Sequence, residues 1–310
     1  MLSNGKQVVI KQMTELNGCG AVRASWLLAV TLVGLSAPAF AQRSIAGAVV
    51  PLSAQTDQSA AAVRHERGQL VAPVYEGWYR DGKGELNLSF GYLNRNFTEE
   101  LDIPIGPDNK IEPGPPDQGQ PTHFIPRRQW GAFSVVVPRE LEHQLLAEKR
   151  TVTWTLRANG QMATVPANLS SAYSIDALHE PTVGNEPPEL QFESGGSAGM
   201  GPFGARSKIT ATAGVPIVIR MRVHDDQRAL PQKRNAGVKL LWTRYRGAGA
   251  VQFADATSSV VGDGPASVTV TFADPGEYAI RVEAIDSEIH DFQCCWSNGI
   301  VYADVRAGNR

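Results

Sequence analysis

Cysteine, clustered charge and long apolar runs are all scarce in this chain. Among its 310 residues there are 3 cysteines, and charged residues make up 19% of the composition with a formal net charge of -2. Binding to nucleic acid or to an anionic membrane needs clustered lysine and arginine, and the chain carries no such cluster. We therefore expect neither nucleic acid nor an anionic lipid surface among its partners.

Recognisable catalytic motifs are missing as well. The sequence contains no nucleophile elbow, no His-Glu-x-x-His zinc helix and no cysteine beside an apparent base. Residues 199–204 match a dinucleotide-binding fingerprint as a string, but Pro202 and a strand-like segment follow where a helix is required. We interpret them as a glycine-rich loop and expect a non-catalytic protein, although β-sandwiches are able to host enzymes.

The longest uncharged apolar run covers residues 26–35 and resembles the core of a secretory leader. At about ten residues it is too short to span a bilayer. Basic residues precede it, and Ala39 and Ala41 are the small residues that a signal peptidase reads. We predict a signal peptide over residues 1–41, with Met13 as an alternative start. The mature chain is then periplasmic or secreted and has no transmembrane anchor.

The mature chain keeps two adjacent cysteines, Cys294 and Cys295, because Cys19 lies in the predicted leader. In an oxidising compartment two thiols tend to pair. One peptide unit, however, holds the two Cα atoms closer than an ordinary disulfide prefers. A vicinal disulfide, two free thiols and links to another molecule all stay open.

Alternation of apolar and polar residues dominates the first half of the mature chain. Residues 42–69 are rich in Ala, Gln and Ser and predict a flexible tether. Residues 70–179 contain several period-2 segments, and residues 86–92 predict a strand with one wet face. Only residues 139–150 have helical spacing. The pattern predicts an antiparallel β-sandwich, and hence an all-β protein.

A second sandwich is predicted beyond a proline-rich linker at residues 180–188. In residues 189–307, a glycine-bearing turn delivers Tyr278 to the start of an alternating strand, as at the E–F corner of an immunoglobulin-like fold. Trp242 falls where such folds keep a core tryptophan on strand C. We therefore predict two tandem immunoglobulin-like β-sandwich domains.

These motifs carry a family resemblance. Strand B ends in Asp225-Asp226, Trp242 follows on strand C, and the Tyr278 turn runs on to Asp286. In these features the last third of the chain resembles polycystic-kidney-disease-type and related bacterial immunoglobulin-like domains. The resemblance implies a spacer, an adhesion module or an appendage to an enzyme. The N-terminal half is similar to secreted bacterial proteins of unassigned function.

An acidic cluster is predicted at one pole of the second sandwich. Strands B and F run in the same direction, so Asp225, Asp226 and Asp286 should converge with His290 and Asp291 of the F–G loop. Hard oxygen ligands suit Ca²⁺, whereas His224 and His290 would favour Zn²⁺. The alternative is that the aspartates only cap turns.

Partner contacts are predicted on loops of both sandwiches. Phe292 and Trp296 of the F–G loop are candidates for a protein or glycan contact, because aromatic side chains offer a large contact area at low entropic cost. His123, Arg127 and Arg128 lie at the end of an unusually long connection, residues 107–126. They are able to hold an anion or to pair with nearby acidic residues.

Glycan recognition is a separate hypothesis. It would use Trp78, Tyr245 or Trp296 as stacking surfaces. The most economical interpretation of the sequence is an exported binding or structural module of the bacterial envelope. A metal-dependent accessory or catalytic protein and a glycan-binding module are the alternatives.

Overall fold

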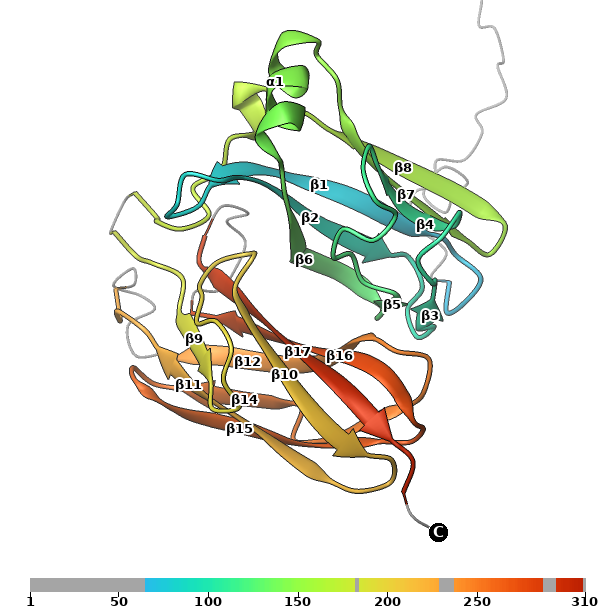
Figure 1. Cartoon of the computed structure of the whole chain (residues 1–310), viewed down its shortest axis with the longest axis vertical. Coiled ribbons are helices and arrows are strands. Elements are labelled where there is room, and N and C mark those ends of the chain that lie inside the picture. Colours follow the sequence, from blue (N-terminus) through green and yellow to red (C-terminus); the bar gives the residue numbers. More distant parts are fainter. Residues whose placement is uncertain (1–64, 182–183, 229–236, 287–293, 309–310) are drawn as a thin grey trace, which may run out of the picture. The chain divides into compact units, whose positions relative to one another are not determined.

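The structure is a computed structural model that describes residues 65–181, 184–228, 237–286 and 294–308. All of them belong to one compact unit, Ser59–Arg310. Strands dominate this unit, beside the helix α1 (Arg139–Ala147) and the 3₁₀ helix η2 (Ser171–Tyr173), so the predicted all-β class is confirmed (Figure 1). No helix in the described ranges has the length and apolar character to cross a membrane. The predicted leader lies outside these ranges.

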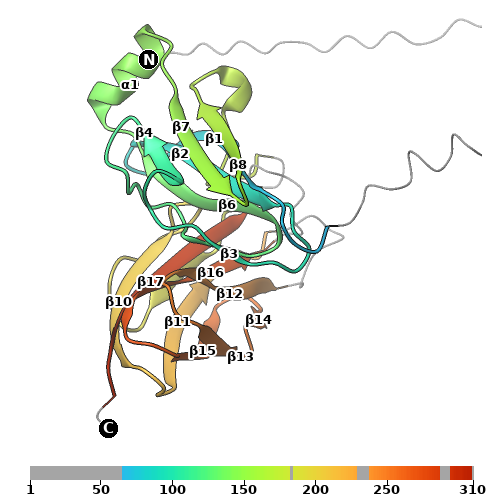
Figure 2. The same cartoon turned by 90° about the vertical axis from the view of Figure 1, so that its right-hand side faces the viewer.

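Strands β1 to β8 form the first sandwich. Its two three-stranded sheets have the orders β1-β2-β6 and β4-β7-β8, and β3 pairs with β5 beside them. Figure 2 shows these strands with α1 above them at the top of the view. The strands are β1 (Val71–Arg80), β2 (Leu86–Asn94), β3 (Leu101–Asp102), β4 (Asn109–Glu112), β5 (His123–Phe124), β6 (Arg127–Val136), β7 (Val152–Ala158) and β8 (Gln161–Ala167).

Aromatic side chains fill the space between these sheets. Phe90 and Phe133 are register partners on β2 and β6, and their rings stack 5.4 Å apart. Trp154 of β7 meets both rings edge-on from the opposite sheet, at 5.9 and 4.9 Å. Alternation puts these residues on inward faces, and offset or edge-on aromatic contacts stabilise such a core beyond area burial alone.

The predicted wet face of β2 is wrong. Asn87 and Ser89 are fully buried, because β2 is the central strand and both of its faces are covered. Tyr79, the register partner of Asn87, packs in a small second cluster with Ile175 and Ala177. The polar positions of β2 therefore mark a covered face that sequence alternation alone does not distinguish from an exposed one.

Strands β9 to β17 form the second sandwich. Its sheets have the orders β10-β17-β16-β12-β14 and β13-β15-β11-β9. In immunoglobulin lettering β11 is B, β12 is C, β15 is E, β16 is F and β17 is G. The strands are β9 (Glu189–Phe192), β10 (Ala205–Thr212), β11 (Ile217–His224), β12 (Val238–Arg246), β13 (Val251–Ala254), β14 (Thr257–Val260), β15 (Gly264–Phe272), β16 (Gly276–Ile285) and β17 (Trp296–Arg306).

Tyr278 lies where the sequence places it. Its hydroxyl donates a hydrogen bond to the main-chain carbonyl of Asp274 across 2.9 Å. Gly249 leaves room for that hydroxyl, since a Cβ at this position would lie 2.1 Å from it. Trp242 on β12 is 1% exposed, and Ile280 is fully buried in the core of the same sandwich. These contacts give the second sandwich its immunoglobulin-like E–F corner.

The hydrophobic core of the first sandwich is shared with residues of the second, which also has a core of its own. Tyr245, Ala279 and Ile300 project from the five-stranded sheet of the second sandwich, and all three belong to the cluster that fills the first. At the same boundary the Asn298 amide donates to the Gly131 carbonyl across 2.7 Å. The division into domains at residues 180–188 stays a prediction, because described residues on both sides of it lie in one compact unit.

The long connection at residues 107–126 contributes to this boundary. It contains β4 and β5, and residues 117–122 within it contact β12. The two Arg246 Nη atoms donate to the Asp117 carboxylate across 2.8 and 2.7 Å, and the Tyr245 hydroxyl donates to the Gly119 carbonyl. The Arg246 hydrogen bonds lower the pKa of Asp117, so this pair is ionised at neutral pH.

Candidate functional site

Two carboxyl groups and one amide meet at one end of the second sandwich. Asp225 follows β11 and Asp286 follows β16, so the strand directions bring them together as predicted. The Asn185 amide, from the segment between the sandwiches, donates to Asp286 Oδ1 across 3.1 Å. The Asp225 and Asp286 carboxyls are hydrogen-bonded to each other, with Asp226 close by. We call Asn185, Asp225 and Asp286 the acidic pole.

The electrostatics of the acidic pole favour a proton or a cation held between its two carboxyl groups. Burial raises the pKa of Asp286 to about 7, with repulsion from Asp225 adding to the rise and the Asn185 hydrogen bond opposing it. Burial also raises the pKa of Asp225, and repulsion from Asp226 contributes. Two buried carboxyls in contact cannot both ionise freely, so the pair holds a proton or a cation near neutral pH.

Two oxygen atoms of the acidic pole lack partners. Asp225 Oδ1 and Asn185 Oδ1 are buried and accept no hydrogen bond from any described residue, and their residues are 8% and 3% exposed. A buried oxygen without a partner costs free energy unless a ligand satisfies it. Carboxylate and amide oxygens are the ligands that Ca²⁺ prefers. The acidic pole therefore has the donor chemistry of a hard-cation site.

The predicted metal ligands are only partly assembled. Asp226 Oδ1 accepts a hydrogen bond from the Arg228 backbone N–H across 2.8 Å, which is a turn-capping contact. Within the described ranges, no group of three or more His, Cys, Asp or Glu side chains is arranged to hold a metal ion. A cation would thus depend on the Asn185 amide oxygen as well as on carboxylates. His290 and Asp291 lie outside the described residues.

The zinc-favouring histidine has a different contact. His224 Nδ1 lies 2.6 Å from Asp263 Oδ1, and both side chains are largely exposed. The same carboxylate lies 3.4 Å from the Asp225 backbone nitrogen. His224 is therefore engaged by the loop before β15, beside the acidic pole, and a zinc site stays a prediction.

The structure joins Cys294 and Cys295 in a vicinal disulfide with a Cα–Cα distance of 3.2 Å. Both residues are buried. Their sulfur atoms lie 3.9 and 3.6 Å from the Asn185 carbonyl oxygen. The disulfide therefore packs on the residue whose side chain contacts Asp286.

Trp296 is buried by contacts within the chain. It is 1% exposed, and its indole Nε1 lies 3.4 Å from the Gly131 carbonyl oxygen of the first sandwich. Tyr245 is also buried, while Trp78 is half-buried and donates to the Ser170 carbonyl. Neither Trp296 nor Tyr245 offers a free ring for partner or glycan stacking. Phe292 lies outside the described residues.

The basic residues predicted to bind a partner have partners within the chain. His123 is buried between Asp102 and Arg244, with its Nδ1 2.9 Å from Asp102 Oδ1 and 2.7 Å from Arg244 Nη2. Arg127 stacks on the Phe97 ring at 4.1 Å. Arg128 stacks on Trp130 and pairs with a buried Glu76 across 2.6 Å. An additional role in partner binding stays a prediction.

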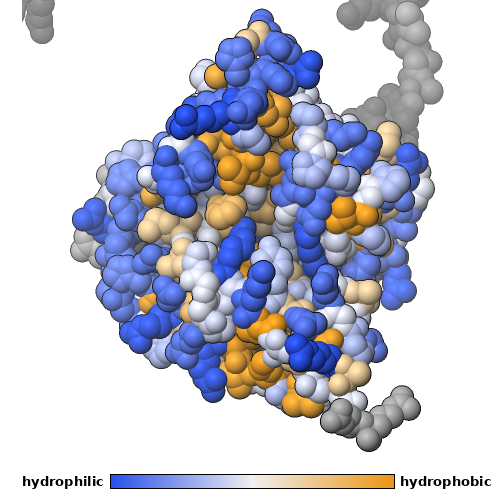
Figure 3. Space-filling view, viewed as in Figure 1, coloured by the Kyte–Doolittle hydropathy of each residue, from blue (hydrophilic) through white to orange (hydrophobic). Residues whose placement is uncertain are grey.

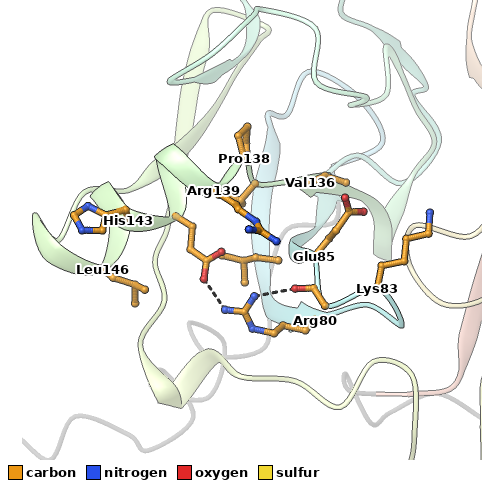
Figure 4. Close-up of a pocket in the computed structure, with 12 residues that line it drawn as sticks. Arg80, Lys83, Glu85, Val136, Pro138, Arg139, His143 and Leu146 are labelled. Atoms are coloured by element: carbon orange, nitrogen blue, oxygen red, sulfur yellow. Dashed lines mark hydrogen bonds and ion pairs between the residues drawn. The ribbon is translucent and has the colours of Figure 1, made fainter.

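A pocket of about 600 Å³ lies beside α1 (Figure 4). Its apolar lining includes Leu86, Val136 and Leu146, and its rim mixes charges of both signs. Arg80 is held there by Glu142 across 2.5 Å and by the Gly84 carbonyl. Figure 3 shows apolar surface bordered by hydrophilic side chains in the upper part of its view. Because the rim carries charges of both signs, it favours neither an anionic nor a cationic ligand.

Sequence reasoning missed Asn185. Its segment is proline-rich and predicts a linker, so the residue has no periodic context. The local signal is an asparagine two residues before a proline pair at the entry to a sandwich. Only the fold shows that this entry passes the pole where β11 and β16 end.

Comparisons with known proteins place the chain in no family. No protein-family model matches it, and no curated protein matches it. The similar solved structures include domains 4 and 5 of the S-layer protein SbsC, at 12% identity and a TM-score of 0.24. That match covers 51% of this chain and 65% of the S-layer chain, so less than two thirds of the latter is spanned.

Two further structures have a comparable level of similarity. The D00-D0 domain of intimin is 11% identical with a TM-score of 0.24, and the match covers 76% of this chain and 99% of that one. A PapD-like domain of human CEP192 is 11% identical with a TM-score of 0.27, covering 46% and 99%. The immunoglobulin-like assignment rests on the strand order and the Tyr278 corner. The polycystic-kidney-disease type stays a prediction.

Proposed function

We propose that this chain is an exported, non-catalytic binding or structural module of the bacterial envelope or the extracellular space. The observation that carries the proposal is the shared core, in which Tyr245, Ala279 and Ile300 of the second sandwich join the apolar cluster of the first. Burial of apolar surface across the boundary stabilises one rigid body rather than two jointed ones. A rigid body of this kind suits a spacer or a scaffold that presents its end loops.

Export is tested by cell fractionation of the source bacterium together with the intact mass of the recovered protein. We expect the protein in the periplasm or the medium, with a mass that lacks residues 1–41. Cytoplasmic protein that retains those residues would contradict the proposal. A single thermal transition of the purified mature chain is the expected sign of one rigid body.

A second candidate function is cation binding at the acidic pole, favoured by the unpartnered oxygens of Asp225 and Asn185. Ca²⁺ held there would tie the segment between the sandwiches to the ends of β11 and β16. It would act as a structural brace for the loops around it.

The test is a Ca²⁺ titration of mature protein that has been treated with a chelator, followed by isothermal calorimetry and thermal melting. We expect saturable binding and a higher melting temperature, both lost in Asp225→Asn. Asp263→Asn is the matched control beside the acidic pole and should keep the binding. An unchanged melting temperature with Ca²⁺ would rule this function out.

A further inference from the structure

One arginine of the second sandwich is half-buried and has no acidic partner among the described residues. Arg206 lies on β10, its guanidinium stacks on the Phe203 ring at 4.5 Å, and its Nη1 donates to the Ala205 carbonyl. Burial lowers the pKa of Arg206, and the groups that oppose this effect are tyrosines. Among the described residues no carboxylate pairs with it. Partly desolvated charges in proteins are normally paired, so Arg206, which contacts the Tyr302 hydroxyl but no carboxylate among the described residues, favours an anion.

Arg206 lines a pocket of about 420 Å³ at the edge of the five-stranded sheet. The parallel pairing of β10 and β17, seen side by side in Figure 1, sets Lys208 next to Tyr302. Lys208 is exposed and has no ion pair with any described residue. None of the residues that line this pocket is acidic. The lining consists of Ser194, Gly195, Gly196, Ser197, Arg206, Ser207, Lys208 and Tyr302.

The rest of the lining offers hydroxyl groups and accessible backbone. Ser194 and Ser207 place their Oγ atoms 2.9 Å apart. Gly196 has a φ of 98°, and a Cβ there would lie 2.1 Å from the Arg206 carbonyl oxygen, so only glycine fits. At Gly195 a Cβ would meet nothing within 4 Å, which leaves the backbone open to a ligand.

Two aromatic side chains beside the pocket are exposed. Phe203, on whose ring Arg206 stacks, is 40% exposed, and Tyr302 of the pocket lining is 38% exposed. Exposed aromatic side chains next to hydroxyl donors suit a sugar ring, which presents C–H groups on one face and hydroxyls at its edge. Arg206 and Lys208 add the charge that a carboxylate requires.

We propose that this pocket, lined by Arg206, Lys208 and Tyr302, binds an acidic saccharide whose carboxylate contacts the two cations. The inference deepens the proposed binding role and names its ligand class. It relocates glycan recognition from the buried Trp296 and Tyr245 to an exposed edge of β10 and β17. Because it is measured on purified protein, its failure is distinguishable from a failure of export.

The experiment is isothermal calorimetry of the mature protein with trigalacturonate, and with its methyl ester as the uncharged match. We expect a dissociation constant below about 1 mM for the acid and binding at least about tenfold weaker for the ester. Lys208→Gln should weaken binding of the acid about tenfold. Arg206→Gln should also weaken binding of the acid about tenfold, provided that thermal melting shows this variant to be folded.

Arg222→Gln is the matched control, because Arg222 is an exposed strand arginine on β11 in the opposite sheet. It should bind as the wild type does. Three results would overturn the proposal: no saturable binding of trigalacturonate, equal binding of acid and ester, or full affinity in Lys208→Gln. Acetate binding as tightly as trigalacturonate would also overturn it, since the pocket would then select a small anion only.

Discussion

The side chains of Asn185 and Asp286 lie 101 positions apart in the sequence and are joined by a 3.1 Å hydrogen bond. This bond fastens the segment between the two sandwiches to the end of β16. It also positions the Asn185 carbonyl oxygen under the Cys294–Cys295 disulfide. The acidic pole is thus a junction of three chain segments.

The acidic pole predicts a pH dependence of stability. The pKa of Asp286 is raised from 3.8 to about 7 in the folded state. Between these values the folded state binds more protons than the unfolded state. The free energy of unfolding should therefore decrease as the pH rises through this window and level off above about pH 7. Urea denaturation at a series of pH values, with chelator present, measures the slope.

Asp286→Asn isolates this contribution, because the amide cannot titrate and should flatten the decrease. Asp176→Asn, at an exposed loop position, is the control and should keep the wild-type slope. If Asp286→Asn follows the wild-type curve over the whole window, the raised pKa of Asp286 is refuted.

The tyrosine corner predicts that Tyr278→Phe lowers the free energy of unfolding by a measurable amount. The substitution removes the hydroxyl that donates to Asp274 and leaves that carbonyl with one partner fewer. We expect the free energy of unfolding to drop by about 1–2 kcal/mol in chemical denaturation. Tyr173→Phe, at a tyrosine that is 44% exposed, should change it by less than about 0.5 kcal/mol. Equal effects of the two substitutions would remove the special role of Tyr278.

The cysteines predict a distinctive alkylation pattern. Cys294 and Cys295 are joined in the structure, so unfolded, non-reduced mature protein should take up no iodoacetamide. After reduction it should gain two adducts, as read by intact mass. An adduct on Cys19 would mean that the leader is retained. Adducts on Cys294 or Cys295 without reduction would mean that the thiols are free or linked elsewhere.

Much of the second sandwich is predictable from its sequence, because its strands alternate cleanly and Tyr278 marks its corner. Two details escape this reasoning. The first two strands of this sandwich, β9 and β10, join different sheets. The short β13 and β14 are too brief for periodicity to reveal. Alternation reports which residues face a core, and it does not report where a strand changes sheets.

The contacts between the sandwiches are the part that no local pattern reveals. Trp296 has the sequence context of a loop aromatic, yet the ring is buried because β6 of the first sandwich covers it. The segment at residues 107–126 likewise has the length of a functional loop and instead packs on β12. Both depend on long-range packing. The convergence of Asp225 and Asp286, by contrast, follows from strand direction alone.

The shared core is tested most directly at Gly131 by differential scanning calorimetry of the mature chain. Gly131 has a φ of 43°, and a Cβ there would lie 2.2 Å from the Trp296 ring. Gly131→Ala should lower the free energy of unfolding by about 2–4 kcal/mol. At Gly160 an added Cβ meets nothing within 4 Å. Gly160→Ala should therefore lower the free energy of unfolding by only about 1 kcal/mol, the cost of holding an alanine at positive φ.

We predict one cooperative transition in the wild type, shifted as a whole to lower temperature in Gly131→Ala and much less in Gly160→Ala. Two separate transitions, of which Gly131→Ala moves at most one, would contradict a core shared by both sandwiches.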